Sequence, residues 1–406
     1  MRRSPLPEKQ IQGNPLECQL RTFATFLRES GYRTRTIQDK LYLVAAFGWW
    51  LGQSRRTMAD IDEQLVQTFC KHKHKTRRFD LATLAQFLDH VRKYGGIPHR
   101  KLVAEQSPPA DILNAYERYL RWERGVIPAT IIEYRSYALK FLVDRFGGER
   151  IVLSELKASD VCGFVLRHGR SLGIKRAQLL ATAFRSFLRF LFQKGELGID
   201  LAAAVPSIPN WPRSSVPKYL NPEEVQRVLK TCDLGTPMGR RDYAILLLLA
   251  RLGLRAGEVV ALQFEDINWR TGEILVRGKG MRLDRMPLPD DIGNALASYL
   301  RRDRPACPTR RVFVCMKAPH RGLAAHGTVA TIVRCAIERA NLHPPRKGAH
   351  VFRHSLATSM LRSGATMREI GEVLRHRSPN TTEIYAKVDF DGLRSLAHPW
   401  PIGGER

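Results

Sequence analysis

Two histidines and an arginine stand close together in the segment His350-Val-Phe-Arg-His354, and their spacing suggests a shared binding role. Intervals of three and four residues place His350, Arg353 and His354 on one side of a helix. Such a face could hold a metal ion, but the guanidinium of Arg353 would repel a cation. Because a guanidinium binds phosphate and carboxylate oxygens instead, the segment predicts a site for an anion and no metal.

Two further segments each contain one basic residue in a defined local setting. In residues 252–258 (LGLRAGE), a helix is expected to end at Gly253, and Arg255 follows at the start of the next helix. In residues 277–280 (RGKG), Lys279 is expected at the tip of a β-turn, between two glycines. Taken alone, each is most simply an ordinary solvated surface residue.

The segment 374–385 (LRHRSPNTTEIY) contains a histidine, His376, and a tyrosine, Tyr385. Asn380, with Glu383 three positions later, predicts the capped start of a helix that carries Tyr385. A single tyrosine on an amphipathic helix is usually a half-buried packing residue. The four segments are therefore informative only in combination.

In combination, the four segments resemble the active site of the tyrosine recombinase, or phage integrase, family, which contains an Arg, a Lys, a His-x-x-Arg pair, a His or Trp, and a Tyr in this order. The resemblance covers roughly residues 220–390. Two departures accompany it: Arg375 occupies a position where a glycine often precedes the histidine, and Arg285 is shifted by one position relative to the usual hairpin motif. The resemblance implies six catalytic residues: Arg255, Lys279, His350, Arg353, His376 and Tyr385.

The resemblance implies that the protein breaks and rejoins DNA strands without a metal, a cofactor or ATP. Arg255 and Arg353 would bind the scissile phosphate, because its transition state concentrates negative charge on the non-bridging oxygens. The phenol of Tyr385, with an ordinary pKa of about 10, would need a proton acceptor before it attacks the phosphate, and the resemblance gives that role to His350. Lys279 would protonate the departing 5′ hydroxyl, which leaves a 3′-phosphotyrosyl bond.

The same resemblance gives other polar residues of the segments smaller roles. His376 would donate a hydrogen bond to the phosphate, Glu258 would orient the arginines, and His354 would serve helix packing. The phosphotyrosyl bond conserves the energy of the broken phosphodiester, so a 5′ hydroxyl of another strand can reseal it. Four protomers on two DNA sites would exchange strands through a Holliday junction, as is typical of the family.

The composition favours a nucleic acid as partner. The 406-residue chain contains 66 Lys and Arg against 39 Asp and Glu, a formal net charge of +27, and the basic residues are spread along the whole sequence. Basic groups that neutralise phosphates release condensed counterions, which favours double-stranded DNA, although an RNA-associated protein would have a similar charge. Seven scattered cysteines without a CxxC pair, no signal peptide and no long apolar segment predict a cytoplasmic protein that does not enter membranes.

The order of predicted elements indicates a multidomain, mainly α-helical chain with a mixed α+β catalytic domain. Four prolines between residues 204 and 220 predict an extended linker, and residues 221–224 (NPEE) predict the capped start of a helix after it. Short strands at residues 273–277 and 284–288 predict a small antiparallel sheet. The predicted domains are residues 1–103, residues 108–205, a linker at 206–219, the catalytic domain at 220–390 and a tail at 391–406.

The two N-terminal domains have the pattern of two copies of one helical module. Residues 26–37 (FLRESGYRTRTI) are similar to residues 119–131 (YLRWERGVIPATI), and residues 87–95 (FLDHVRKYG) are similar to residues 187–195 (FLRFLFQKG). The shared order of elements favours a tandem duplication over a chance similarity between amphipathic helices. The second copy resembles the domain that closes on DNA in this family, and its candidate phosphate contacts are Arg135, Lys140, Arg170, Lys175 and Arg176.

Several functions remain open at this level. The leading hypothesis is an integrase-like or transposase-like recombinase of a bacterial mobile element, which acts as a homotetramer on specific DNA sites, with or without companion recombinases. A type IB topoisomerase shares the chemistry, and a DNA-binding protein with an inactive site is the alternative outside enzymes. The first copy would bind flanking DNA or another subunit, and residues 388–400 either dock on a neighbouring subunit or form a frayed end. Residues 70–78 (CKHKHKTRR) predict a basic DNA-facing loop rather than a metal site.

Overall fold

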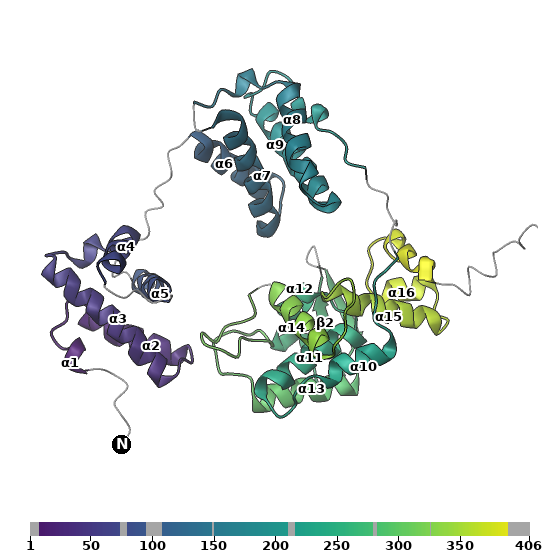
Figure 1. The fold of residues 1–406 in the computed structure, drawn as a ribbon. Coiled ribbons are helices and arrows are strands. Elements are labelled where there is room, and N and C mark those ends of the chain that lie inside the picture. The colour runs from purple at the N-terminus through teal and green to yellow at the C-terminus, as the bar shows by residue number, and fades with distance from the viewer. Residues whose placement is uncertain are drawn as a thin grey trace, which may run out of the picture. The chain divides into compact units, whose positions relative to one another are not determined.

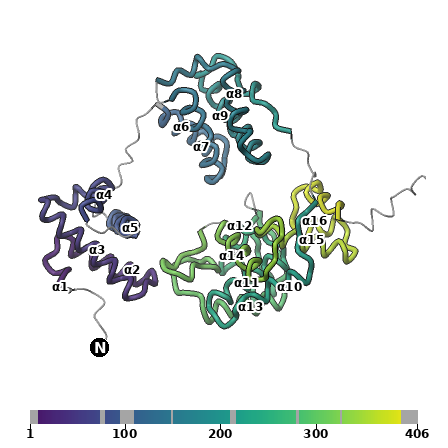
Figure 2. The backbone as a smooth tube through the Cα atoms, in the orientation of Figure 1, coloured from purple at the N-terminus to yellow at the C-terminus, as the bar shows by residue number. Residues whose placement is uncertain are grey.

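The computed structural model describes residues 8–73, 79–94, 108–147, 150–209, 216–278, 282–324 and 326–388. The chain divides into residues 98–212 and a second unit formed by residues 1–97 and 213–406. Buried hydrophobic residues form separate clusters within residues 11–91, 113–205, 220–352 and 357–388. We therefore describe a first helical body (8–94), a second helical body (108–209) and a C-terminal body (216–388), which Figures 1 and 2 show. No helix among the described residues is both long and apolar enough to cross a membrane.

The first helical body buries Leu20, Phe47 and Phe87 completely. Apolar side chains recur every three or four residues along its helices, so each helix has one face to bury. Asp62 caps the fourth helix by accepting a hydrogen bond from the backbone of Leu65 at 2.7 Å. The elements are α1 (Glu8–Ile11), α2 (Glu17–Glu29), α3 (Thr34–Gln53), the short 3-10 helix η1 (Met58–Asp60), α4 (Glu63–His72) and α5 (Asp80–Lys93).

The second helical body repeats the order from α2 to α5, without a counterpart of α1 and with the additional short helices η2 and η4. Its core contains the fully buried rings of Tyr116, Phe141 and Phe187. The elements are α6 (Pro108–Arg118), the π-helix η2 (Tyr119–Glu123), α7 (Pro128–Phe146), the 3-10 helix η3 (Leu153–Glu155), α8 (Ala158–Arg170), α9 (Ile174–Gln193) and the 3-10 helix η4 (Leu201–Ala204).

The packing of aromatic rings repeats between the two helical bodies. In the first, Phe23 of α2 meets Phe87 of α5 edge to face, with ring centroids 5.3 Å apart and ring planes at 77°. In the second, Tyr116 of α6 meets Phe187 of α9 in the same way, at 5.1 Å and 65°. The six buried residues of α5 from Thr83 onward each have a buried counterpart one hundred positions later: Thr83, Leu84, Phe87, Leu88, His90 and Val91 correspond to Ala183, Phe184, Phe187, Leu188, Phe190 and Leu191.

A single extra residue in the second helical body explains a shift in the correspondence. Phe23 and Tyr116 are 93 positions apart, whereas Gly31 and Gly125, which both adopt positive φ (82° and 59°), are 94 positions apart. The π-helical turn η2 lies between Tyr116 and Gly125, and a π-turn takes up one more residue than an α-helical turn. The one-residue difference between the two bodies therefore coincides with this π-turn.

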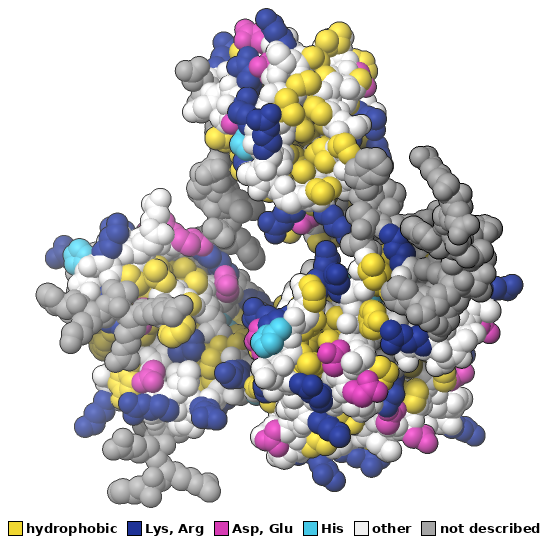
Figure 3. Space-filling model, turned by 45° about the vertical axis from the view of Figure 1, so that its right-hand side comes forward, with side chains coloured by type: hydrophobic (Ala, Val, Ile, Leu, Met, Phe, Trp, Pro, Cys, Tyr) yellow, Lys and Arg dark blue, Asp and Glu magenta, His cyan; other side chains and the backbone are white. Residues whose placement is uncertain are grey.

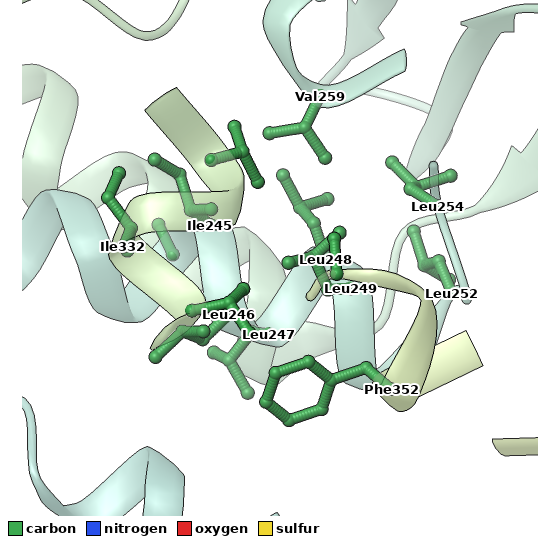
Figure 4. Close-up of a cluster of buried hydrophobic side chains, with 14 of the residues drawn as sticks. Ile245, Leu246, Leu247, Leu248, Leu249, Leu252, Leu254, Val259, Ile332 and Phe352 are labelled. Atoms are coloured by element: carbon green, nitrogen blue, oxygen red, sulfur yellow. The ribbon is translucent and has the colours of Figure 1, made fainter. Parts of the chain in front are cut away.

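The C-terminal body is built around α11, whose residues 244–249 (AILLLL) are all buried. A helix that is hydrophobic on every side must lie inside a core. Figure 4 shows side chains of α11 next to Val259 of α12, Ile332 of α14 and Phe352 of α15. The helices are α10 (Pro222–Lys230), α11 (Pro237–Arg251), α12 (Ala256–Ala261), α13 (Asp290–Arg302), α14 (His326–Arg339), α15 (His350–Arg362) and α16 (Met367–Val373), with 3-10 helices η5 (Phe264–Asp266), η6 (Pro379–Thr381) and η7 (Glu383–Val388).

A three-stranded antiparallel sheet accompanies these helices. Its strands are β1 (Ile267–Asn268), β2 (Glu273–Arg277) and β3 (Leu283–Pro287), in the order β1-β2-β3. Ile274 pairs with Met286 and Val276 with Asp284, so Ile274 and Val276 point to the buried side of β2. The fold class predicted from the sequence is therefore confirmed: mainly helical and multidomain, with a small antiparallel sheet in the C-terminal body.

Local predictions in the C-terminal body agree with the structure to different degrees. Asn221 and Glu224 form the predicted capping box of α10, with reciprocal bonds of 2.7 and 2.9 Å. Strand β3 lies one residue earlier than predicted, and β1 was not predicted because it has two residues. The predicted helix around Tyr385 is wrong, because that segment forms the separate 3-10 helices η6 and η7. The proline at 379 and the hydrogen bond from the Thr382 amide to its carbonyl favour these tighter turns.

Candidate active site

Arg255 stands at the N-terminus of α12, as the sequence predicts. α11 ends at Arg251, and Gly253 reverses the chain with a φ of 58°, a conformation that favours glycine. Arg255 is the N-cap residue, and its backbone amide donates to Glu258 Oε2 at 2.8 Å. Its Nη1 also donates to Glu258 Oε1 at 2.7 Å, while 38% of the Arg255 side chain remains exposed. The guanidinium is thus held on one side and open to solvent on the other.

Arg353 lies on α15 and is almost fully buried. Its Nη1 donates to the carbonyl of Gly253 at 2.6 Å, and its Nη2 donates to the carbonyl of Leu374. Burial, followed by the charges of the nearby guanidiniums of Arg255 and Arg375, lowers the pKa of Arg353 to about 10. The side chain therefore connects the turn before α12 to the turn after α16, next to Arg255.

Arg375 is part of the same charge cluster, and the sequence predicts no role for it. Its side chain is only 7% exposed, and its Nη2 donates to Glu258 Oε2 at 2.8 Å. Its Nε lies 4.0 Å from Asp284 Oδ2 on β3, and its Nη1 contacts the sulfur of Met286. The sequence indicates only that Arg375 replaces the glycine usual at this position, and it does not predict the contact with Glu258.

His376 follows in the same turn. Its Nδ1 lies 2.7 Å from the hydroxyl oxygen of Thr382, and its backbone amide donates to the carbonyl of Gly371 at 2.9 Å. Burial, followed by the charges of Arg353 and Arg255, lowers the pKa of His376 to about 4. The ring is therefore neutral near pH 7, and if Thr382 fixes Nδ1, the other nitrogen is left for a ligand.

Tyr385 of η7 is 1% exposed, and its hydroxyl lies 2.9 Å from Nδ1 of His354. Burial raises the pKa of Tyr385 to about 12, and the charge of Arg353 opposes that rise. Burial also lowers the pKa of His354 to about 4, with smaller contributions from His350 and Arg353 in the same direction. A neutral imidazole can accept the phenol proton in a hydrogen bond. The sequence predicts only a packing role for His354, so this contact emerges from the structure alone.

The two remaining predicted catalytic residues are described to different extents. His350 is the first residue of α15 and is exposed, with its ring centroid 6.5 Å from that of His354. Lys279 lies between β2 and β3, outside the described residues. The structure thus brings Arg255, Arg353, His376 and Tyr385 into one connected site, and the roles assigned by resemblance remain predictions.

A cavity of about 580 Å³ opens beside His376 and Arg375. Its lining contains both basic and acidic side chains, together with His376 and Thr382: the basic ones are Arg282, Arg368 and Arg375, and the acidic ones are Asp284, Glu372 and Glu383. Within the described part of the chain, no group of three or more His, Cys, Asp and Glu side chains is arranged to hold a metal ion.

The predicted DNA contacts of the second helical body lie on its surface. Lys140 of α7 and Lys175 and Arg176 in the first turn of α9 are exposed. Arg135 is half-buried and is bonded to Glu117 at 2.8 Å and to Asn114 at 3.1 Å. Figure 3 shows Lys and Arg side chains on the visible faces of all three bodies. The residues 74–78 of the predicted basic loop and the tail beyond residue 388 lie outside the described residues.

Comparison with known proteins agrees with this geometry. Residues 218–391 match the model of the phage integrase family. The putative integrase/recombinase y4rA of Sinorhizobium fredii is 42% identical over 390 residues, which cover 95% of each chain. Tyrosine recombinase XerC of Oceanobacillus iheyensis is 30% identical over 310 residues, which cover 72% of this chain and 97% of the relative. A structure of the XerH site-specific recombinase bound to palindromic difH substrate has a similar fold, with a TM-score of 0.56 and 17% identity over 96% of this chain and 95% of that one.

The chain therefore belongs to the phage integrase family of tyrosine recombinases. As an enzyme it is a site-specific DNA recombinase of the tyrosine type, and the resemblance inferred from its sequence is confirmed.

Proposed function

We propose that this recombinase cuts and rejoins the DNA of a mobile element through a 3′-phosphotyrosyl intermediate on Tyr385, without a metal or ATP. The observation that carries the proposal is one connected cluster. Arg353 of α15 donates hydrogen bonds to the turn before Arg255 and to the turn before His376. Tyr385, which is 1% exposed, contacts His354 of the same helix. The name of the relative y4rA, a putative integrase/recombinase, supports a role in integration or transposition.

The arrangement supports a charge-stabilised attack on a phosphodiester. Two guanidiniums, of Arg255 and Arg353, bind the non-bridging oxygens and stabilise the charge that develops in the transition state. Neutral His376 donates a hydrogen bond to the same phosphate. The buried phenol of Tyr385 leaves its hydrogen bond to His354 and attacks phosphorus once its proton is taken up, by His350 or by His354 itself.

The cleavage step also needs a proton donor for the departing 5′ hydroxyl, and Lys279 takes this role in the proposal. The phosphorus–oxygen bond to that hydroxyl breaks as the bond to Tyr385 forms, so no bond energy is lost to water. A 5′ hydroxyl of a second strand then attacks the phosphotyrosyl bond and releases the phenol. Two such exchanges on paired sites pass through a Holliday junction.

The partner in the proposal is double-stranded DNA with specific recombination sites, bound by a homotetramer, with or without companion recombinases. The neighbouring structure of XerH is a complex with its difH substrate, which supports a DNA partner. We assign residues 108–205 to a clamp on the core site and residues 1–103 to a duplicated copy of that clamp, and the repeated ring packing supports the duplication. The protein would act in the bacterial cytoplasm, on the nucleoid.

The direct test is a cleavage assay on nicked DNA from the ends of the element that encodes the protein, in EDTA. The nick lets the short 5′ fragment diffuse away, which traps the covalent intermediate. The wild type is expected to form a protein–DNA adduct, and Tyr385→Phe is expected to bind the DNA without forming one. A wild type that binds and never forms an adduct would favour a DNA-binding protein with an inactive site. Relaxation of supercoiled plasmid by a monomer without site preference would favour a type IB topoisomerase.

A further inference from the structure

We propose that Arg375 is a positioning residue of the active site, which orients Arg255 through Glu258 and holds strand β3 against the turn that precedes His376. The inference rests on the proposed function, because it names a further residue for that reaction. It concerns a side chain that contacts other protein groups and not the phosphate.

The backbone conformation of Arg375 is strained for a residue that has a side chain. Its φ of 56° lies in the left-handed region, where a residue with a Cβ is about 1–2 kcal/mol less stable than in a right-handed helix. Arg55 and Asn341 also have positive φ, but both are exposed in turns. Glycine would adopt this conformation without strain. A long, buried side chain at such a position indicates that its contacts offset the strain.

The first of those contacts is a carboxylate shared between two arginines. Glu258 is 4% exposed, and its Oε2 accepts from Nη2 of Arg375 at 2.8 Å. The same carboxylate accepts from Nη1 of Arg255 at 2.7 Å and from the backbone amide of Arg255 at 2.8 Å. Arg375 therefore fixes the far side of the group that holds Arg255. Without Arg375, Glu258 would be held only by its bonds to Arg255 itself, so the direction of the Arg255 guanidinium would be less well fixed.

The second contact is with strand β3. Asp284 and Met286 lie on the same side of β3, and Arg375 reaches both, with its Nε 4.0 Å from Asp284 Oδ2. β2 and β3 bracket the segment that contains Lys279. The residue before Arg375 accepts a hydrogen bond from Arg353, and the residue after it is His376. One turn thus connects both phosphate-binding arginines, the histidine and the base of the hairpin.

The test compares Arg375→Gly, Arg375→Lys and the wild type in the full chain, on the nicked substrate at saturating DNA. Glycine removes the strain together with the contacts, so the melting temperature should stay the same or rise. The rate constant for adduct formation should fall about 10- to 100-fold, since a catalytic group displaced by about 1 Å costs this order of rate, while DNA affinity stays unchanged. Arg375→Lys should recover part of the rate, because an ammonium reaches one carboxylate but lacks the planar fork.

A double variant and a control make the result specific. In a Glu258→Gln background, adding Arg375→Gly should cause a smaller loss than it does in the wild type, because the contact through Glu258 is already weakened and mainly the contact with β3 is left to lose. Arg310→Ala is the control, since Arg310 is an exposed arginine of the same body that is bonded to Glu265 and does not line the cavity beside His376, and it should keep the wild-type rate. Three outcomes would overturn the proposal. The first is a double variant whose rate loss equals the product of the two single losses, and the second is a wild-type rate in Arg375→Gly. The third is an equal loss of rate in Arg375→Gly and Arg375→Lys together with a lower melting temperature. Absence of an adduct with the wild type would instead refute the proposed function.

Discussion

The proposed nucleophile, Tyr385, is kept in a protonated, shielded state. The hydroxyl of Tyr385 lies in a buried contact with His354, and burial raises its pKa to about 12. In this state the phenol is a poor nucleophile at neutral pH. Binding of a phosphate beside Arg353 and Arg255 would supply the positive field and the driving force for releasing the phenol. In the proposed mechanism, the reactivity of Tyr385 therefore depends on a proton acceptor, and His350 and His354 are the two candidates.

Single substitutions should separate the roles of these histidines. If His350 accepts the proton, His350→Ala should slow adduct formation by about 100-fold or more, as is usual for loss of a general base. His354→Ala removes the hydrogen bond that holds the phenol and should cost less, about 10-fold. Single-turnover cleavage of the nicked substrate measures both. The reverse order would assign proton transfer to His354 and leave His350 a secondary role.

Two half-buried neutral histidines should make the stability of the C-terminal body depend on pH. The pKa values of His354 and His376 are lowered from 6.5 to about 4, so the unfolded chain takes up protons more readily than the folded chain below pH 6.5. The free energy of unfolding should be highest above pH 6.5 and should fall as the pH drops towards 4. A decrease of about 1–2 kcal/mol per histidine is expected after allowance for partial exposure.

Thermal unfolding between about pH 7.5 and about pH 4.5 measures this dependence. His376→Asn keeps a polar side chain that does not titrate, and it should flatten the pH profile while His72→Asn, an exposed control on α4, leaves it unchanged. An unchanged slope in His376→Asn would show that this histidine is equally easy to protonate in the folded and unfolded chains.

Among the helices, the two helical bodies differ at one informative core position. His90 of α5 occupies the place that Phe190 has on α9, and both rings pack against the first long helix of their body, at 5.5 Å from Phe23 and 5.2 Å from Tyr116. Burial lowers the pKa of His90, and its Nδ1 has no hydrogen-bond partner among the described residues. A buried polar atom without a partner costs stability.

His90→Phe should therefore stabilise the first helical body by about 1–2 kcal/mol, because the equivalent core already accepts phenylalanine. Hydrogen exchange of the amides of α5 in the full chain reports the stability of this body directly. The reciprocal change, Phe190→His, should reduce protection of α9 by a similar amount. Destabilisation by His90→Phe would mean that the two cores are not equivalent in packing.

Elements with strong local signals could be predicted from the sequence. The capping box of α10, the glycine turn before Arg255 and strand β2 all follow from short-range rules, and the structure contains them. The segment around Tyr385 could not be predicted, because a capping pattern at Asn380 does not reveal that the chain winds tightly against α15. The contact between Tyr385 and His354 and the shared carboxylate of Glu258 join residues far apart in sequence, so they depend on the tertiary fold alone.

For the molecule as a whole, the net charge of +27 should dominate the affinity for DNA. Binding that neutralises phosphates releases counterions, so the logarithm of the affinity should fall linearly with the logarithm of the salt concentration. The double variant Lys175→Ala/Arg176→Ala should reduce the slope by about 2 if both residues contact phosphates. Fluorescence anisotropy of a labelled core site across a salt series measures the slope. A slope equal to that of the wild type would show that Lys175 and Arg176, at the start of α9, do not contact DNA phosphates.

The division of the chain into bodies also defines what each assay reports. The proposed catalytic residues Arg255, Arg353, His376 and Tyr385 lie in the C-terminal body, whereas Lys and Arg side chains lie on the visible faces of all three bodies (Figure 3). Substitutions in the helical bodies should therefore change DNA affinity and its salt dependence, whereas substitutions in the site should change the rate of adduct formation at saturating DNA.

The identity of the amino acid that becomes bonded to DNA decides the proposed mechanism. The adduct formed on the nicked substrate would be digested with nuclease and protease, and the peptide that retains a nucleotide would be sequenced by mass spectrometry. We expect a single modified peptide, with a 3′-phosphate bonded to the phenolic oxygen of Tyr385. A nucleotide on any other residue, or a phosphate joined through its 5′ oxygen, would refute the mechanism.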